Sequence, residues 1–222
     1  MTEAIALSNI LVRNGELHIL DGFDLRVEKG SLCVLLGAGG SGKTTIFKLL
    51  TGQIKPERGN VKIGGVDVSL LKGSKLAKFR RSIGMIAQNE SLLENRTVAE
   101  QILLPLEIEG MNAARRRERV EAVIERFYLQ PSRARLPASL SMSERQRGVI
   151  ARAVVREPLV LLADEPAAHL DVKDAREIAR LLLHENLRGM TVLIGTSDEH
   201  FASYFPDNAI RRMEALNTGI EN

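Results

Sequence analysis

A glycine-rich stretch, GAGGSGKTT at 37–45, carries the clearest chemical pattern in the sequence. It matches G-x-x-x-x-G-K-[ST], in which glycines let backbone N–H groups turn toward a phosphate and the following helix adds its positive end. In that pattern the lysine reaches the β- and γ-phosphates, and the next hydroxyl binds magnesium. The alternative is an ordinary glycine-rich turn before a helix. The candidate phosphate-binding residues are Gly37, Ala38, Gly39, Gly40, Ser41, Gly42, Lys43, Thr44 and Thr45, with Thr44 also a metal ligand.

An acidic pair, Asp164 and Glu165, ends the apolar run 159–163. A carboxylate at the carboxyl end of a buried strand can hold magnesium through water when a phosphate loop lies beside it. Asp164 is therefore a candidate metal ligand, and Glu165 is a candidate catalytic residue that polarises an attacking water. The alternative is that the pair caps a helix ahead of Pro166. Together with the glycine-rich stretch, the pair predicts a site for a nucleoside triphosphate with Mg²⁺.

These residues require buried strands that end next to one another. Short apolar runs without alternation, typical of strands covered on both faces, lie at 31–36, 82–88, 159–163 and 190–195. Helical patterns occupy 43–52, 112–129, 144–157 and 171–189. In the second of these, Asn112 is the expected N-cap of the helix. The alternation of strands and helices predicts a mainly parallel sheet with helices on both faces.

Two further stretches, 5–30 and 58–71, carry short alternating runs that predict antiparallel strands. The expected turns are Asn14-Gly15, Asp21-Gly22, Lys29-Gly30, Gly59 and Gly64-Gly65. The predicted fold class is α/β, with a phosphate-loop (RecA-like) core sheet, a small antiparallel β subdomain and an inserted helical subdomain. We expect one domain over 1–222, in which 1–90 and 154–222 form the core and β subdomain and 91–153 forms the helical subdomain.

Composition narrows the class of protein. The 31 basic and 28 acidic residues leave a net charge of +3, which is too mild an excess to argue for nucleic acid. Cys33 is the single cysteine, so no disulfide can form within the chain, which suits the cytosol. The N-terminus lacks the pattern of a signal peptide, and no run approaches the roughly 18–20 apolar residues that span a bilayer. Any membrane role is therefore expected to come through a partner.

The order of these motifs resembles the ATP-binding-cassette (ABC) ATPases over essentially the whole chain. The resemblance rests on the glycine-rich stretch, Gln88, LSMSERQRGVIARAV at 140–154, LVLLADEP at 159–166, AHLD at 168–171 and TVLIGTSD at 191–198. Within that family, 83–88, 91–110 and 150–166 resemble the FtsE branch and its lipoprotein- and macrolide-export relatives, LolD and MacB. The resemblance implies that two cassettes face head to tail and sandwich two ATP molecules between them.

The resemblance also implies roles for single residues. Gln88 would touch Mg²⁺ and the attacking water, Ser141 would meet the γ-phosphate bound to the opposing cassette, and Asp171 would organise the dimer interface. Arg13 stands where the family carries an aromatic residue against adenine, and a guanidinium can stack on a base. The residues alone also allow a strand-end glutamine at Gln88 and a helix N-cap at Asp171.

The sequence departs from the family pattern where groups complete the site from across the dimer. Met142 and Ser143 replace two glycines of the signature, although glycine allows positive φ and close approach. Ser197 replaces the histidine that senses the γ-phosphate, while His200 is expected on the surface of the next helix. Ala168-His169 replaces a pair of small residues. The intact glycine-rich stretch, acidic pair and Gln88 predict tight nucleotide binding. The departures predict weak hydrolysis, with Ser197 as a compromised catalytic residue, and a weakened ATP sandwich.

The implied partners are an integral-membrane permease, FtsX-like, and a second ABC ATPase subunit in a homodimer or heterodimer. The expected location is peripheral, on the cytoplasmic face of the inner membrane, with the permease near Gln88 and 92–110. A nucleic-acid partner is not expected, since translation-type cassettes are doubled and chromosome-type cassettes carry long coiled coils. The absence of an N-K-x-D motif argues against a GTPase. The open alternatives are a LolD/MacB-type export ATPase, a non-hydrolysing scaffold subunit, and pairing with an intact second cassette.

Overall fold

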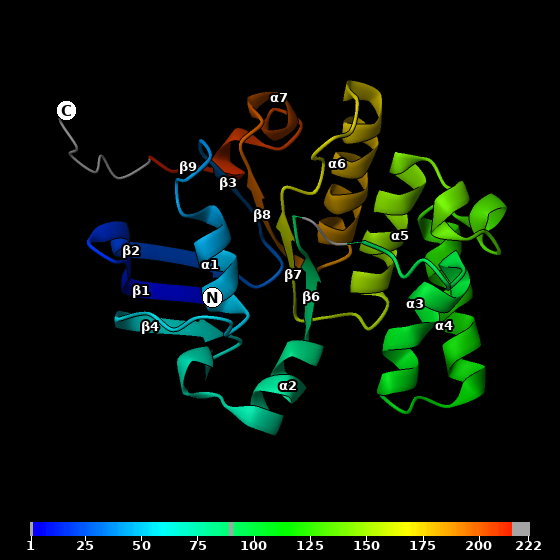
Figure 1. The fold of residues 1–222 in the computed structure, drawn as a ribbon, viewed down its shortest axis with the longest axis horizontal. Coiled ribbons are helices and arrows are strands. Elements are labelled where there is room, and N and C mark those ends of the chain that lie inside the picture. Colours follow the sequence, from blue (N-terminus) through cyan, green and yellow to red (C-terminus); the bar gives the residue numbers. More distant parts are fainter. Residues whose placement is uncertain (1, 89–90, 215–222) are drawn as a thin grey trace.

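The computed structural model describes residues 2–88 and 91–214, which form two sheets and a set of helices (Figure 1). One sheet is parallel, with strand order β6-β7-β8-β3-β9. Its strands are β3 (Leu32–Leu36), β6 (Ile83–Ile86), β7 (Val160–Asp164), β8 (Thr191–Thr196) and β9 (Ile210–Arg212). The other sheet is antiparallel, in the order β2-β1-β4-β5, and consists of β1 (Glu3–Asn14), β2 (Leu17–Glu28), β4 (Arg58–Ile63) and β5 (Val66–Asp67). The predicted α/β class is confirmed.

Helices pack on both faces of the parallel sheet. They are α1 (Lys43–Leu50), α2 (Gly73–Arg81), α3 (Val98–Ile108), α4 (Ala113–Arg126), α5 (Met142–Val154), α6 (Val172–Leu187) and α7 (Glu199–Ala202). Successive side chains of β3 enter different cores: Val34 belongs to the core that includes residues of α3 to α7, while Leu35 belongs to the core that includes α1 and the antiparallel sheet. Burial of both faces explains why the predicted strands are apolar without alternation.

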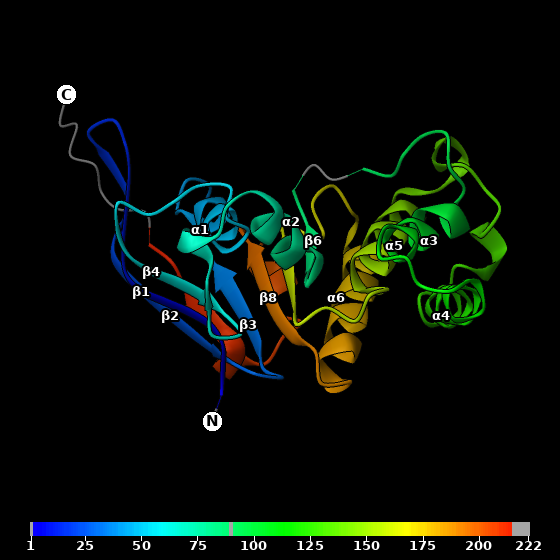
Figure 2. The ribbon, with the colours of Figure 1, turned by 90° about the horizontal axis from the view of Figure 1, so that it is seen from below.

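Helices α3, α4 and α5 lie in the chain between β6 and β7, and Figure 2 shows them beyond α6, away from the antiparallel sheet. Asn112 caps α4, as predicted, by accepting a hydrogen bond from the Arg115 N–H over 2.9 Å. The stripe of Val120, Val123, Ile124 and Phe127 is buried. Among the described residues, no helix has the length and apolarity to cross a membrane.

Three local predictions are wrong. Asp21-Gly22 and Gly59 do not end strands but lie inside β2 and β4, where Gly22 and Gly59 have positive φ values of 63° and 100°. The neighbouring pairing with β1 shifts register, so these residues form bulges that bend the long strands. Helix α5 begins at Met142 rather than at 144, because Ser141 and Glu144 form a capping box. Strand β9 was not predicted.

Candidate functional site

The glycine-rich loop lies between the end of β3 and the start of α1. Gly42 is the N-cap of α1 with φ of 90°, a conformation that side chains disfavour. Gly37 is equally constrained, because a Cβ there would lie 2.5 Å from the carbonyl oxygen of Met213, just after β9. The loop therefore needs glycine at both ends, and its backbone leads directly into the positive end of a helix.

Lys43 is buried at the first position of α1, and its ammonium group points back into the loop. Its Nζ donates to the carbonyl oxygens of Gly37, over 2.6 Å, and Ala38, over 3.0 Å. The same Nζ lies 3.9 Å from a carboxylate oxygen of Glu165. Because the side chain of Lys43 is only 6% exposed, its charge is held where loop, helix and acidic pair meet.

The three residues predicted to hold the metal line one cavity. Thr44, Gln88 and Asp164 all border a space of about 460 Å³ between α1 and the end of β6. Asp164 is 2% exposed, and its Oδ1 has no hydrogen-bond partner. Burial raises the pKa of the Asp164 carboxyl, against an opposing hydrogen bond from the Thr44 hydroxyl. A buried, unpaired carboxylate oxygen beside a hydroxyl and an amide is a hard-oxygen donor set, which fits Mg²⁺.

Glu165 follows β7 in a left-handed conformation, with φ of 50°. Its Oε2 accepts a hydrogen bond from the Thr196 hydroxyl over 3.2 Å, and its N–H donates to the Gly195 carbonyl. The Thr196 hydroxyl also accepts from the Asp198 N–H over 3.1 Å. Sequence reasoning missed Thr196, although its place at the end of β8 beside β7 was a usable signal. Lys43 therefore lies near one carboxylate oxygen of Glu165, and Thr196 is hydrogen-bonded to the other.

Ser197 follows Thr196 and is exposed, at the carboxyl end of the same parallel sheet. His200 lies on α7, and its Nε2 is 2.8 Å from the Tyr204 hydroxyl. The expectation of a surface histidine on the next helix is therefore met.

The signature segment, residues 140–144, leads into α5. The side chains of Ser141 and Glu144 cap the start of that helix. The Ser141 hydroxyl accepts from the Glu144 N–H over 3.1 Å, while a Glu144 oxygen accepts from the Ser141 N–H over 2.8 Å. Burial alone would raise the pKa of Glu144, but hydrogen bonds from the Ser132 hydroxyl and Ser141, with the charge of Arg135, lower it below its usual value. Neither Met142 nor Ser143 has positive φ, so the helix itself does not require the two missing glycines.

Arg13 and Asp171, two of the predicted site residues, make contacts away from the glycine-rich loop. The Arg13 guanidinium binds Glu57, with Nε–Oε2 at 2.9 Å and Nη2–Oε2 at 2.5 Å, and both side chains are more than 40% exposed. Asp171 is the N-cap of α6, since its Oδ1 accepts from the Asp174 N–H over 2.8 Å. Neither contact touches the loop or the acidic pair, so the roles of Arg13 and Asp171 remain predictions.

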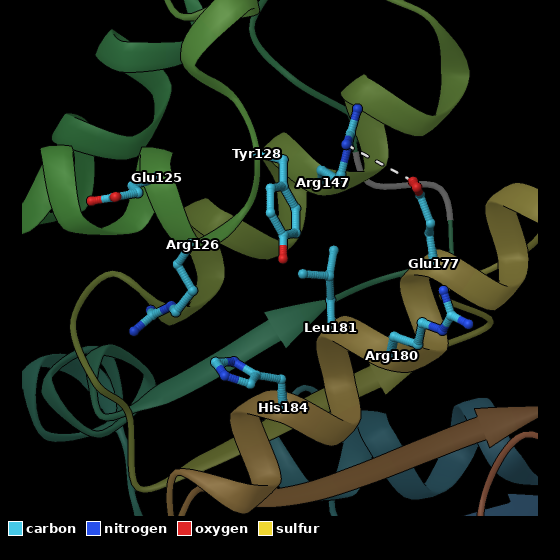
Figure 3. Close-up of a pocket in the computed structure, with 8 residues that line it drawn as sticks. All are labelled: Glu125, Arg126, Tyr128, Arg147, Glu177, Arg180, Leu181 and His184. Carbon is cyan, nitrogen blue, oxygen red and sulfur yellow. Dashed lines mark ion pairs between the residues drawn. The ribbon is translucent and has the colours of Figure 1, made fainter.

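Another cavity, of about 570 Å³, lies between the end of α4 and the faces of α5 and α6 (Figure 3). The ring of Tyr128 lies across it above Leu181, and Arg147 pairs with Glu177 at its edge over 3.9 Å. None of the predicted site residues lines this space. This cavity is larger than the one lined by Thr44, Gln88 and Asp164. The candidate site is therefore identified by the chemistry of its residues and not by its volume.

Comparisons with known proteins agree with this geometry. A methionine import ATP-binding protein (MetN 2) of Listeria innocua is 38% identical over 201 residues, covering 88% of this chain and 59% of that protein. The cell division ATP-binding protein FtsE of Mycobacterium tuberculosis is 38% identical over 200 residues, covering 90% of this chain and 85% of that protein. The chain thus spans 59% of the length of its methionine-import relative.

A solved structure shares the fold. The ATP-binding cassette MJ0796, in a dimeric post-hydrolysis state bound to ADP and Pi, matches with a TM-score of 0.82 at 29% identity. The match covers 95% of this chain and 94% of that one. The family model for ABC transporters matches residues 5–168, which include the glycine-rich loop, Gln88, Asp164 and Glu165. This chain therefore belongs to the ABC transporter family.

Proposed function

We propose that this chain is the ATP-binding and ATP-hydrolysing subunit of an ABC-type membrane complex. The observation that carries the proposal is the meeting of Lys43, Asp164 and Glu165 at the carboxyl ends of β3 and β7. Binding of a triphosphate tail requires a lysine donor and a carboxylate for the metal, and its hydrolysis requires an oriented base. Lys43, Asp164 and Glu165 are groups of these types.

The residues of the chain have separable tasks in this mechanism. The loop N–H groups and Lys43 bind the β- and γ-phosphates, and Lys43 exchanges its bonds to the Gly37 and Ala38 carbonyls for phosphate oxygens. Thr44, Gln88 and Asp164 would hold Mg²⁺, which when bound neutralises phosphate charge. Glu165, oriented by Thr196, accepts hydrogen bonds from the attacking water and polarises it toward the γ-phosphate.

We further propose that hydrolysis is slow and that the ATP sandwich is weak. Met142, the first residue of α5, is 55% exposed and stands next to the N-cap Ser141, so it adds bulk where the family carries glycine. Ser197 is too short to bridge the γ-phosphate and Glu165 as a histidine would. Loss of one such transition-state donor typically costs about 10²–10³ in rate.

The finer assignment is to an FtsE-like subunit, peripheral on the cytoplasmic face, that acts in a dimer and docks on an FtsX-like permease. Similarity to FtsE over 85% of that protein supports it. A second candidate is an import subunit, favoured by the equal identity to the methionine import protein. Purification from detergent-solubilised membranes, with identification of the co-purified integral-membrane protein, separates the two. To stack on adenine, Arg13 would have to release its ion pair with Glu57.

Calorimetry with Mg·ATP tests the central proposal. Lys43→Ala removes the ammonium group at the loop and should abolish measurable binding, whereas Lys62→Ala, which alters an exposed side chain of β4, should leave it unchanged. Glu165→Gln should retain binding and reduce phosphate release. Equal nucleotide uptake by the Lys43→Ala protein would refute the proposed site.

A further inference from the structure

The cavity of about 570 Å³ beside Tyr128 takes no part in the proposed function (Figure 3). Its volume lies within the range of roughly 300–1,000 Å³ that is typical of small-molecule sites in proteins. Residues from three parts of the chain border it: the end of α4 with the turn after it, α5 and α6. Because none of the proposed nucleotide- or metal-binding residues borders this cavity, a ligand here would occupy a separate site.

Tyr128 follows α4 in a left-handed conformation, with φ of 53°. Glycine is the residue that most often takes this position after a helix, because a side chain raises the energy of a positive φ. The tyrosine ring belongs to neither hydrophobic core, and Tyr128 is 70% exposed. Tyrosine therefore costs stability here without adding to core packing, and what its ring provides is an aromatic wall of the cavity.

The cavity also offers hydrogen-bond donors that lack acceptors. The Nε of Arg147 is buried without a hydrogen-bond partner, and its Nη1 lies 3.9 Å from an oxygen of Glu177, which is beyond hydrogen-bond distance. Arg180 is exposed on α6 and makes no hydrogen bond or ion pair within residues 2–88 and 91–214. The Tyr128 hydroxyl and the His184 ring can donate as well. Buried donors are normally satisfied by protein, by water or by a bound group.

Nearby carboxylates do not satisfy these donors. Glu185, which is 1% exposed, is paired with Arg126, whose Nε lies 2.9 Å from its Oε1. Figure 3 shows the Glu125 carboxylate directed away from the Tyr128 ring. The groups left over are therefore mainly donors, and two of them are guanidinium groups. Carboxylate and phosphate oxygens are the acceptors whose geometry guanidinium donors match best.

We propose that this cavity binds a small molecule in which an aromatic ring carries an anionic group, either a carboxylate or a phosphate. The ring would pack against Tyr128 above Leu181, in the offset or edge-to-face arrangement that aromatic pairs prefer. The anionic oxygens would accept hydrogen bonds from Arg147 and Arg180, so a bound ligand would bridge α5 and α6. This site lies outside the proposed ATP-binding function and does not depend on it.

Calorimetry with 2-naphthoate and 2-naphthyl phosphate tests the site, and the tighter of the two identifies the preferred anionic group. A ligand of this size in a matching cavity should bind with a Kd on the order of 1 mM or below. The uncharged analogue 2-naphthamide keeps the ring and should bind at least about tenfold more weakly. Saturating Mg·ATP should leave each Kd unchanged. Displacement of both probes by Mg·ATP, equal binding of the amide, or no heat from either anion at ~10 mM would overturn the proposal.

Variants locate the bound probe. Tyr128→Gly removes the ring at a position that favours glycine, so the Tm should hold or rise while the Kd of the tighter probe rises about tenfold. Tyr128→Phe keeps the ring and should bind within about threefold of the wild type. Arg147→Gln and Arg180→Gln should each raise the Kd by about fivefold or more. The matched control is Arg176→Gln, which alters an exposed side chain of α6 outside the cavity and should leave the Kd unchanged.

The two proposals fail in distinguishable ways. An unchanged Kd in folded Tyr128→Gly and Arg180→Gln proteins would refute this site and leave the proposed function standing. A chain that binds the naphthyl probes but takes up no Mg·ATP would instead refute the proposed function and leave this site standing.

Discussion

Restoring the missing groups gives the sharpest test of the proposed slow hydrolysis. The variant Met142→Gly/Ser143→Gly/Ser197→His restores the two signature glycines and the histidine that senses the γ-phosphate in the family. Its effect on folding can be worked out from the structure. Glycine at the first two positions of α5 costs at most about 1 kcal/mol each. Ser143 is 5% exposed and its hydroxyl has no hydrogen-bond partner, so deleting that hydroxyl returns about 1–3 kcal/mol.

The two terms nearly cancel, and Met142 loses little burial because it is already 55% exposed. We therefore expect the Tm to stay within about 4 °C of the wild type, given about 2–4 °C for each kcal/mol. The capping box of Ser141 and Glu144 is not altered. The rate of phosphate release should rise by about 10²–10³ if a transition-state donor has been regained.

The assay is steady-state phosphate release at saturating Mg·ATP, with Ser197→His and the signature pair also measured separately. Glu165→Gln in the repaired protein is the control, and it should return phosphate release to the background rate of the assay. An unrepaired protein that already matches the repaired one, with intact folding in both, would refute the argument that Met142, Ser143 and Ser197 limit hydrolysis.

Three further outcomes are expected. Thr196→Val removes the hydroxyl bound to Glu165 and Asp198, so phosphate release should fall while Mg·ATP binding holds, and urea unfolding should show a loss of about 1–3 kcal/mol. Because burial raises the pKa of Asp164 in the folded chain, folding becomes less favourable as pH rises past the ordinary aspartate range. Asp164→Asn should therefore raise the Tm at pH 7, more than at pH ~4, by about 2–4 °C per kcal/mol recovered, while Mg²⁺-dependent ATP binding and turnover are lost; an unchanged Tm at both pH values would contradict the burial argument. Burial raises the pKa of Cys33 to about 11, so iodoacetamide at pH ~8 should label it only after denaturation, as mass spectrometry would show.

The chemistry of the site and the strands beneath it follow from local patterns. The glycine-rich loop is specified by residues adjacent in sequence, because positive φ at Gly42 and the start of α1 are local requirements. The strands before Gly37 and Asp164 are equally visible, since a strand covered on both faces must be apolar throughout. Asn112 and Asp171 were identifiable as N-caps because a cap bonds only to the next turn of its own helix.

Contacts between distant segments were decided by the tertiary structure. The bulges at Gly22 and Gly59 arise from pairing with β1, so a turn-like dipeptide could not reveal that the strands continue. Thr196 reaches Glu165 only because β8 lies beside β7 in the sheet. The hydrogen bond from Arg152 Nη2 to the Ser91 carbonyl joins residues 61 positions apart. Residue types and short spacings in the sequence therefore gave the chemical groups, whereas packing between elements determined which groups hold one another in place.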